Sequence, residues 1–123
     1  MQINESVENY LETILMISQE KGNVRSIDIV HELNFTKASV SVAMGKLKKN
    51  GYVKVDDNGF LTLTRSGMKI AKATYERHEL LKDFLIYLGV DAKTAEDDAC
   101  RMEHAVSDET LKCLKRHFDE LKK

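Results

Sequence analysis

The sequence predicts a mainly helical chain that is interrupted once by a small β-hairpin. Three observations support this fold class. Proline is absent, apolar residues recur at helical spacing through most of the chain, and an Asn-Gly pair separates two short, nearly alternating segments. With 123 residues, 42% of them hydrophobic and 32% charged, the chain suffices for one ordinary domain or two small layers that share a core. The order of elements below predicts a division into residues 1–73 and 74–123.

The first 50 residues predict three helices. The first covers residues 6–18, and its inward face is expected to comprise Val7, Tyr10, Leu11, Ile14, Leu15 and Ser18. Ser26 is expected to cap a second helix over residues 27–33, with Ile27, Val30 and Leu33 inward. After a tight turn at residues 34–36, Thr36 caps a third helix that ends near Asn50. Its inward residues are expected to be Val40, Ala43, Met44 and Leu47.

A hairpin and three further helices follow. Residues 52–55 and 60–63 predict two strands, and Asn58-Gly59 between them is a strong hairpin signal, because both residues tolerate positive φ angles. The next three helices are expected over residues 64–88, 91–105 and 107–121, capped by Thr64, Asp91 and Ser107. The apolar face of the long helix is expected to comprise Ile70, Thr74, His78, Leu81, Leu85 and Leu88.

The order of three helices and a hairpin is typical of a winged helix-turn-helix, whose second paired helix enters the major groove of DNA. Residues 36–72 hold eight basic and two acidic residues, an excess of six positive charges, whereas residues 76–123 hold nine basic and twelve acidic residues. Small side chains suit base edges, and lysines suit phosphates. The residues expected to contact DNA are Ser26, Thr36, Lys37, Ala38, Ser39, Ser41, Val42, Lys46, Lys48, Lys49 and Lys54. The alternative is a small α+β domain with a solvated lysine face.

The second half carries a pattern typical of metal binding. Cys100, Glu103 and His104 stand at positions i, i+3 and i+4, so one helix face is expected to present all three side chains. His78 lies on the apolar face of the preceding long helix, where a histidine without such neighbours would be a buried core residue. Asn9 and Glu12 are also three residues apart, and by themselves they would be ordinary surface residues.

Several segments together resemble the metal-dependent repressors of the diphtheria toxin repressor and manganese transport regulator family. They are residues 7–14 (VENYLETI), 36–42 (TKASVSV), 75–85 (YERHELLKDFL), 98–104 (DACRMEH) and 107–109 (SDE). The resemblance covers nearly the whole chain and stops where longer members add an SH3-like domain. It implies a homodimer that holds metal in its dimerisation helices and binds a palindromic operator.

The resemblance also implies a ligand set of mixed origin. His78, Glu103 and His104 match ligand positions that the whole family shares, Glu12 matches the manganese branch, and Cys100 matches the iron branch. Asn9 stands where one branch has aspartate and the other methionine, so its role is open. Lys82 stands at a glutamate ligand of the iron branch's second site, and an ammonium cannot bind a metal. Glu79, Asp83 and Glu96 are possible substitutes.

The thiolate favours iron(II), with manganese second, because carboxylate and imidazole alone would suit manganese. If Glu12 binds the same ion as the second-half ligands, metal would restrict hinging between recognition helices and dimer. Open alternatives are a structural zinc site in a metal-independent winged-helix regulator, and a metal carrier that does not bind DNA. An enzyme is not expected, since no oxyanion-stabilising or phosphate-binding loop accompanies the Cys–His pair.

Dimerisation and location follow from the remaining residues. The apolar residues expected in the dimer interface or the monomer core are Leu81, Phe84, Leu85, Leu88, Met102, Val106, Leu111, Leu114 and Phe118. Cys113 is expected in the core, and His31 and His117 on the surface. Two cysteines without a CxxC pair, and no apparent signal peptide or membrane span, indicate a cytoplasmic protein.

Overall fold

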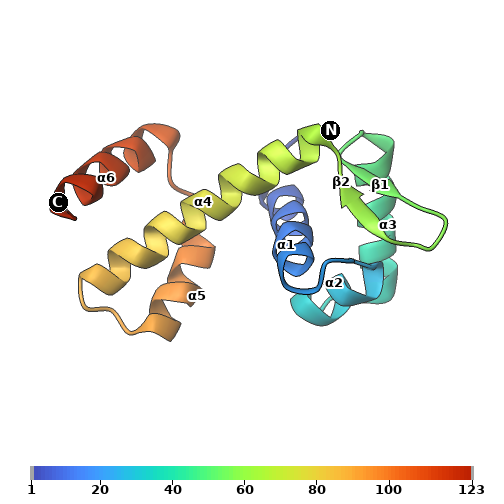
Figure 1. Ribbon diagram of the computed structural model, residues 1–123, viewed down its shortest axis with the longest axis horizontal. Helices are drawn as coiled ribbons and strands as arrows, with labels where there is room; N and C mark the ends of the chain where they lie inside the picture. Colours follow the sequence, from blue (N-terminus) through green and yellow to red (C-terminus); the bar gives the residue numbers. More distant parts are fainter. Residues whose placement is uncertain (1, 123) are drawn as a thin grey trace. The chain divides into compact units, whose positions relative to one another are not determined.

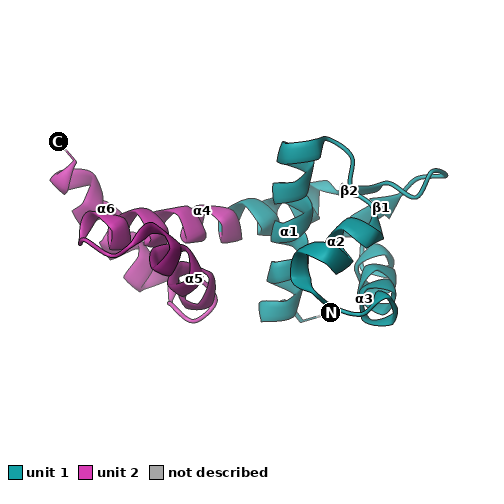
Figure 2. Ribbon diagram, turned by 90° about the horizontal axis from the view of Figure 1, so that it is seen from below, with its two compact units in different colours: residues 1–73 teal, residues 74–123 magenta. Residues whose placement is uncertain are grey.

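The computed structural model describes residues 2–122 and separates them into two compact units, residues 1–73 and 74–123 (Figure 2). The helices are α1 (Glu5–Lys21), α2 (Ser26–Leu33), α3 (Lys37–Lys49), α4 (Arg65–Tyr87), α5 (Ala92–Met102) and α6 (Asp108–Leu121), and the strands are β1 (Val53–Val55) and β2 (Leu61–Leu63) (Figure 1). The predicted mainly helical fold with one small antiparallel hairpin is confirmed. None of the described helices is both long and apolar enough to cross a bilayer.

The first unit is a helical layer closed by the hairpin. Helix α2 packs on α1 and α3, β1 contacts α3, and β2 contacts α1. The strands pair with Val53 opposite Leu63, and a further bridge joins Leu61 to Val24. The core of this unit includes Leu11, Ile14, Val24, Ile29, Val40, Leu47 and Val53, each at most 2% exposed. This packing leaves the outer face of α3 in solvent.

Capping residues explain where several helices begin. Thr36 accepts a hydrogen bond from the backbone N–H of Ser39 at 3.1 Å, and Ser107 does the same for Thr110 at 3.2 Å. Asp91 accepts from Lys93 and Thr94, and Thr64 accepts from Gly67. The four predicted caps at Thr36, Thr64, Asp91 and Ser107 are therefore confirmed.

Helix α2 differs from the prediction in its start and its buried face. Arg25 is its N-cap residue and Ser26 is already helical, because Asp28 accepts a hydrogen bond from the Arg25 backbone N–H at 2.9 Å. Ile29 is fully buried, whereas Ile27 is 38% exposed. The predicted inward position of Ile27 was wrong, since the buried side is centred on Ile29 and not on the stripe of residues 27, 30 and 33.

The hairpin forms at the predicted Asn58-Gly59 turn, and only one of the two residues is left-handed. Gly59 has a positive φ of 83°, but Asn58 does not adopt the left-handed region. The side chain of Asp56 accepts hydrogen bonds from the backbone N–H groups of Asn58 and Phe60, both at 2.9 Å. The connection is thus an aspartate-stabilised loop, in which a single glycine supplies the left-handed residue.

The second unit is built from the second half of α4 together with α5 and α6. Its buried centre is formed by Leu81, Ala99 and Leu111, with Leu80, Met102, Val106 and Leu114 packed against them. The Phe118 ring contacts Phe84 and Tyr87 edge to face, at centroid distances of 5.3 and 5.8 Å. Leu88, predicted to face inward, is 62% exposed because α4 ends at Tyr87.

Two further predictions in this unit were wrong. Helix α5 ends at Met102 and not near residue 105, so Glu103 and His104 lie in the turn that follows. The carbonyl of Met102 accepts from the N–H groups of both Ala105 and Val106, which closes that turn. Cys113 is exposed, because the buried positions of α6 are Leu111 and Phe118. His31 and His117 are exposed as predicted.

Two glycines give a test of the first unit's packing. A Cβ atom at Gly67 would lie 2.1 Å from the backbone oxygen of Tyr52, whereas a Cβ atom at Gly45 would meet nothing within 4 Å. We expect Gly67→Ala to destabilise the protein by about 1–3 kcal/mol, because a backbone oxygen cannot move aside freely. Gly45→Ala should stabilise α3 by up to ~1 kcal/mol. Urea unfolding of both variants measures this, and a Gly67→Ala variant as stable as the parent would contradict it.

Candidate metal centre and nucleic-acid surface

Helix α3 presents a polar and basic face to solvent in the first unit. The exposed residues on and beside it are Thr36, Lys37, Ala38, Ser39, Ser41, Val42, Lys46, Lys48 and Lys49. Lys54 is exposed on β1, and Ser26 is half-buried at the start of α2. The hydroxyl of Thr36 donates to Ser39 Oγ at 2.8 Å while capping the helix, so this residue also has a structural role.

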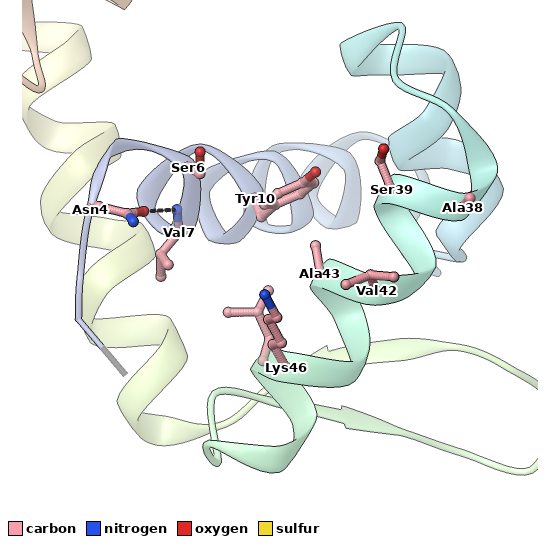
Figure 3. Close-up of a pocket in the computed structure, with 10 residues that line it drawn as sticks. Asn4, Ser6, Val7, Tyr10, Ala38, Ser39, Val42, Ala43 and Lys46 are labelled. Atoms are coloured by element: carbon pink, nitrogen blue, oxygen red, sulfur yellow. Dashed lines mark hydrogen bonds between the residues drawn. The ribbon is translucent and has the colours of Figure 1, made fainter.

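A hollow of about 490 Å³ lies between the start of α1 and the outer face of α3. Figure 3 shows Asn4, Ser6 and Tyr10 on the α1 side, with Val42 and Lys46 facing them from α3. Val42 is 60% exposed there and forms part of the apolar lining of the hollow. An exposed, largely small-residue helix face beside lysines can approach DNA base edges and phosphates.

A second constellation lies within the other unit. The ligand atoms of His78, Cys100 and Glu103, which we call the donor cluster, all lie within 4.8 Å of one another. His78 comes from α4, Cys100 from the last turn of α5, and Glu103 from the turn after α5. The backbone N–H of Glu103 still donates to the Ala99 carbonyl at 3.0 Å, so helical geometry continues to Glu103 and sets its side chain near Cys100.

Glu103 is the most buried member of the donor cluster. It has no exposed surface, and its Oε2 lies 2.9 Å from His78 Nδ1. Its Oε1 accepts no hydrogen bond from the residues that the structure describes, although His104 Nε2 lies 3.2 Å away. A buried carboxylate oxygen without a donor is unfavourable unless a positive charge faces it.

His78 supplies that charge when no metal is present. The hydrogen bond to Glu103 has the largest effect on its pKa and outweighs burial, and a second hydrogen bond to Glu96 acts in the same direction. Together they raise the pKa of His78 from 6.5 to about 9. The imidazolium form therefore predominates at neutral pH, with one ring N–H directed to each carboxylate.

The donor set fits a divalent transition metal. Imidazole nitrogen, thiolate sulfur and carboxylate oxygen are the usual protein ligands of iron(II), cobalt and zinc. The unsatisfied Glu103 oxygen is an independent indication, because a cation there would satisfy it. Cys100 is exposed, so the donor cluster is open to solvent on the thiol side.

The structure places the predicted ligands in two groups. His78, Cys100 and Glu103 meet in the donor cluster, and His104 adjoins it through Glu103. Glu12 and Asn9 belong to α1 in the first unit, where Glu12 is 5% exposed and Asn9 is half-buried. Glu12 is thus not the surface residue that its spacing alone would indicate. Its role as a ligand stays a prediction, as does that of Asn9.

Sequence reasoning gave Glu96 and Arg77 too little weight. Glu96 contacts His78 Nε2 at 2.9 Å, a contact that its position one turn before Cys100 on α5 could have indicated. Arg77 donates to the Glu103 carbonyl at 3.4 Å and also pairs with Asp108. The sequence pattern could not have indicated the contacts of Arg77, because Glu103 and Asp108 lie 26 and 31 residues away from it in the chain.

Comparison with known families covers nearly all of the chain. The model of the iron dependent repressor N-terminal DNA binding domain matches residues 2–59. The model of the iron dependent repressor metal binding and dimerisation domain matches residues 64–123. These two spans contain the exposed α3 face and the donor cluster, respectively.

Individual relatives agree with the family models. An HTH-type transcriptional regulator of Methanocaldococcus jannaschii is 36% identical over 122 residues, 98% of each chain. The HTH-type transcriptional regulator MntR of Shouchella clausii is 40% identical over 102 residues, which are 83% of this chain and 71% of that protein.

Solved structures share the fold. A manganese-dependent transcriptional repressor in complex with manganese has a TM-score of 0.80 at 32% identity, covering 90% of this chain and 51% of that chain. The manganese regulator SloR has a TM-score of 0.79 at 27% identity, covering 97% of this chain and 55% of that chain. This chain thus spans about half the length of those structures. By these matches, the chain belongs to the family of metal-dependent transcriptional repressors described by the iron dependent repressor domain models.

Proposed function

We propose that this protein represses transcription by binding operator DNA as a homodimer when its donor cluster holds a divalent transition metal. The single observation that carries the proposal is the fully buried Glu103 carboxylate, which meets a thiol and an imidazole within 4.8 Å. The same chain exposes a basic helix of the type that enters the major groove. Such a regulator acts where the DNA is, and we therefore place it in the cytoplasm.

We propose iron(II) as the preferred metal, with manganese second. The two solved structures named above are both manganese-dependent regulators by their descriptions. In the manganese branch, however, the resemblance implies a glutamate at the position that Cys100 occupies here. A thiolate is a softer ligand than a carboxylate and favours iron(II), cobalt and zinc over manganese. Since zinc binds such donors more tightly than iron does, metal availability in the cell must contribute to the choice.

Each residue of the donor cluster has a defined role in this proposal. A bound divalent ion would supply the positive charge that Glu103 otherwise receives from the His78 imidazolium. His78 must release one proton to become a ligand, and Cys100 must provide a thiolate. We keep His104 and Glu12 as further proposed ligands, and Asn9 as a neutral oxygen donor.

On the DNA side, we propose that α3 lies in the major groove. Ser39, Ser41 and Val42 would face base edges, and the lysines of α3 and β1 would contact phosphates. Tyr87 and Leu88 are 55% and 62% exposed at the end of α4, and we propose that they contribute to the dimer. Two identical half-sites about 34–36 Å apart would then match a palindromic operator.

The direct test is DNA binding by metal-stripped, reduced protein under anaerobic conditions, using a palindromic duplex from its own upstream region. Iron(II) at micromolar concentration should tighten binding at least tenfold, and manganese should do so less effectively. Cys100→Glu should reverse this order, because a carboxylate replaces the thiolate. Equal DNA binding with and without iron(II), manganese and zinc would contradict metal activation and favour a metal-independent regulator with a structural metal site. Unchanged metal preference in Cys100→Glu would show that Cys100 does not select the metal.

A pH prediction follows from the same imidazole. In metal-free protein, the raised pKa of His78 contributes stability that is fully present below pH 6.5 and is lost as the pH rises through about 9. The difference corresponds to about 3 kcal/mol of unfolding free energy. Urea unfolding of chelator-treated protein at several pH values measures it. His78→Gln should lose this dependence, and His117→Gln, which changes an exposed histidine, should keep it. Parent stability that does not fall between pH 6.5 and 9 would contradict the assignment.

A further inference from the structure

Two residues outside the donor cluster form a continuous polar chain with it. Lys82 Nζ lies 3.1 Å from Glu96 Oε2, and Glu96 Oε1 lies 2.9 Å from His78 Nε2. The other nitrogen of the same ring, Nδ1, lies 2.9 Å from Glu103 Oε2. The order of contacts is therefore Lys82, Glu96, His78, Glu103, and all four residues belong to the second unit.

The elements explain why these side chains meet. Lys82 follows His78 by four residues on α4, so one face of that helix carries both. Glu96 precedes Cys100 by four residues on α5, so the face that carries the thiol also carries this carboxylate. Ala99 is fully buried and packs with Leu81, which holds α5 against α4, and Ala95 is fully buried one turn earlier on α5.

The two carboxylates beside the His78 ring indicate which of its nitrogens is available to a metal. A neutral imidazole has one N–H and one lone pair, and an ionised carboxylate can only accept hydrogen bonds. Each ring nitrogen faces a carboxylate at 2.9 Å, but only Glu103 also belongs to the donor cluster. An ion held by Glu103 would replace the proton on Nδ1, and Glu96 would keep the remaining proton on Nε2. Nδ1 is the atom that already faces Glu103, inside the donor cluster. An outer carboxylate that orients a metal-binding histidine in this way is a common feature of metal sites.

Lys82 explains why Glu96 serves as an acceptor and not as a ligand. Both of its carboxylate oxygens are engaged, one by the imidazole and one by the ammonium group. The Lys82 ammonium group places a positive charge beside Glu96. A protonated amine has no lone pair, so Lys82 itself cannot bind a metal. A second divalent ion at this carboxylate oxygen would have to displace the ammonium group.

We propose that Glu96, held by Lys82, is a positioning residue that presents His78 Nδ1 to a single divalent ion in each subunit. This inference rests on the proposed metal site and specifies its donor atom and its stoichiometry. It also assigns Lys82 and Glu96 a role in metal affinity without direct contact with the ion.

The test uses zinc alone, with affinity measured by competition against a chromophoric chelator and stoichiometry measured on the reduced full-length chain. Glu96→Ala should lower zinc affinity by about 10–100-fold. Glu96→Gln should restore part of it, because the amide oxygen can accept from Nε2–H. Asp97→Ala is the matched control, since it removes a neighbouring exposed carboxylate of α5 and should leave the affinity unchanged. Lys82→Met should weaken binding and Lys82→Arg should preserve it.

A structural role alone would not set the tautomer, so the second readout is the nitrogen-15 spectrum of His78 in the zinc-loaded protein. The parent should show a protonated Nε2 and a metal-bound Nδ1, with one zinc ion per subunit. A metal-bound Nε2, two ions of similar affinity, or full affinity in Glu96→Ala would overturn the inference. Failure of the parent to bind zinc at all would instead overturn the proposed function, so the two failures are distinguishable.

Discussion

A carboxylate without exposed surface is the constraint on which the second unit depends. Glu103 is fully buried, and an ionised group in that position is unfavourable unless a positive charge lies beside it. The His78 imidazolium is that charge in the metal-free protein, and the raised pKa of His78 is the counterpart of the same interaction. In the proposed metal site, a divalent ion and a proton would therefore compete for one location. Such competition would make the unit sensitive to metal without any need for a large empty cavity.

The packing around Glu103 keeps this competition local. Leu81 and Ala99 are almost completely buried and join α4 to α5, so His78 and Cys100 have little freedom to move apart. Arg77 binds the carbonyl of Glu103 and the side chain of Asp108, which connects the turn after α5 to the start of α6. The outer contact from Lys82 through Glu96 completes the support from the other side of the ring. Rigid support of this kind lowers the entropy lost when a ligand set closes on an ion.

The sequence predicted most of the fold because its local signals agree with the tertiary packing. Caps at Thr36, Asp91 and Ser107, and apolar spacing in α1 and α3, were read correctly since each depends on neighbours within a few residues. The buried side of α2 was predicted wrongly. Ile27 and Ile29 are equally apolar, and only the packing of α2 on α1 and α3 distinguishes them. The end of α5 was misplaced for a similar reason. Residues 103–105 are compatible with a helix, and the turn there forms through hydrogen bonds to Met102.

The site was predicted in part for related reasons. Cys100 and Glu103 share a helical turn, and their spacing alone indicated a common face. His78 could be added because a nearby Cys/Glu/His pattern favours a ligand over a core histidine, and the family resemblance agreed with that choice. Glu96 was seen as a possible ligand, but its actual contact with His78 depends on how α4 and α5 pack together. Cys113 illustrates the opposite error, because composition favours burial of cysteine while its position on α6 exposes it.

The most direct test of the central claim is the ligand set of the donor cluster, which cobalt(II) can report by optical titration of the reduced protein. Thiolate ligation gives cobalt an intense charge-transfer absorption in the near ultraviolet. We predict that this band grows with cobalt, is lost in Cys100→Ser, and is retained in Cys113→Ser, which changes the other exposed cysteine. Absence of the band in the parent, or its survival in Cys100→Ser, would contradict a metal site built from His78, Cys100 and Glu103.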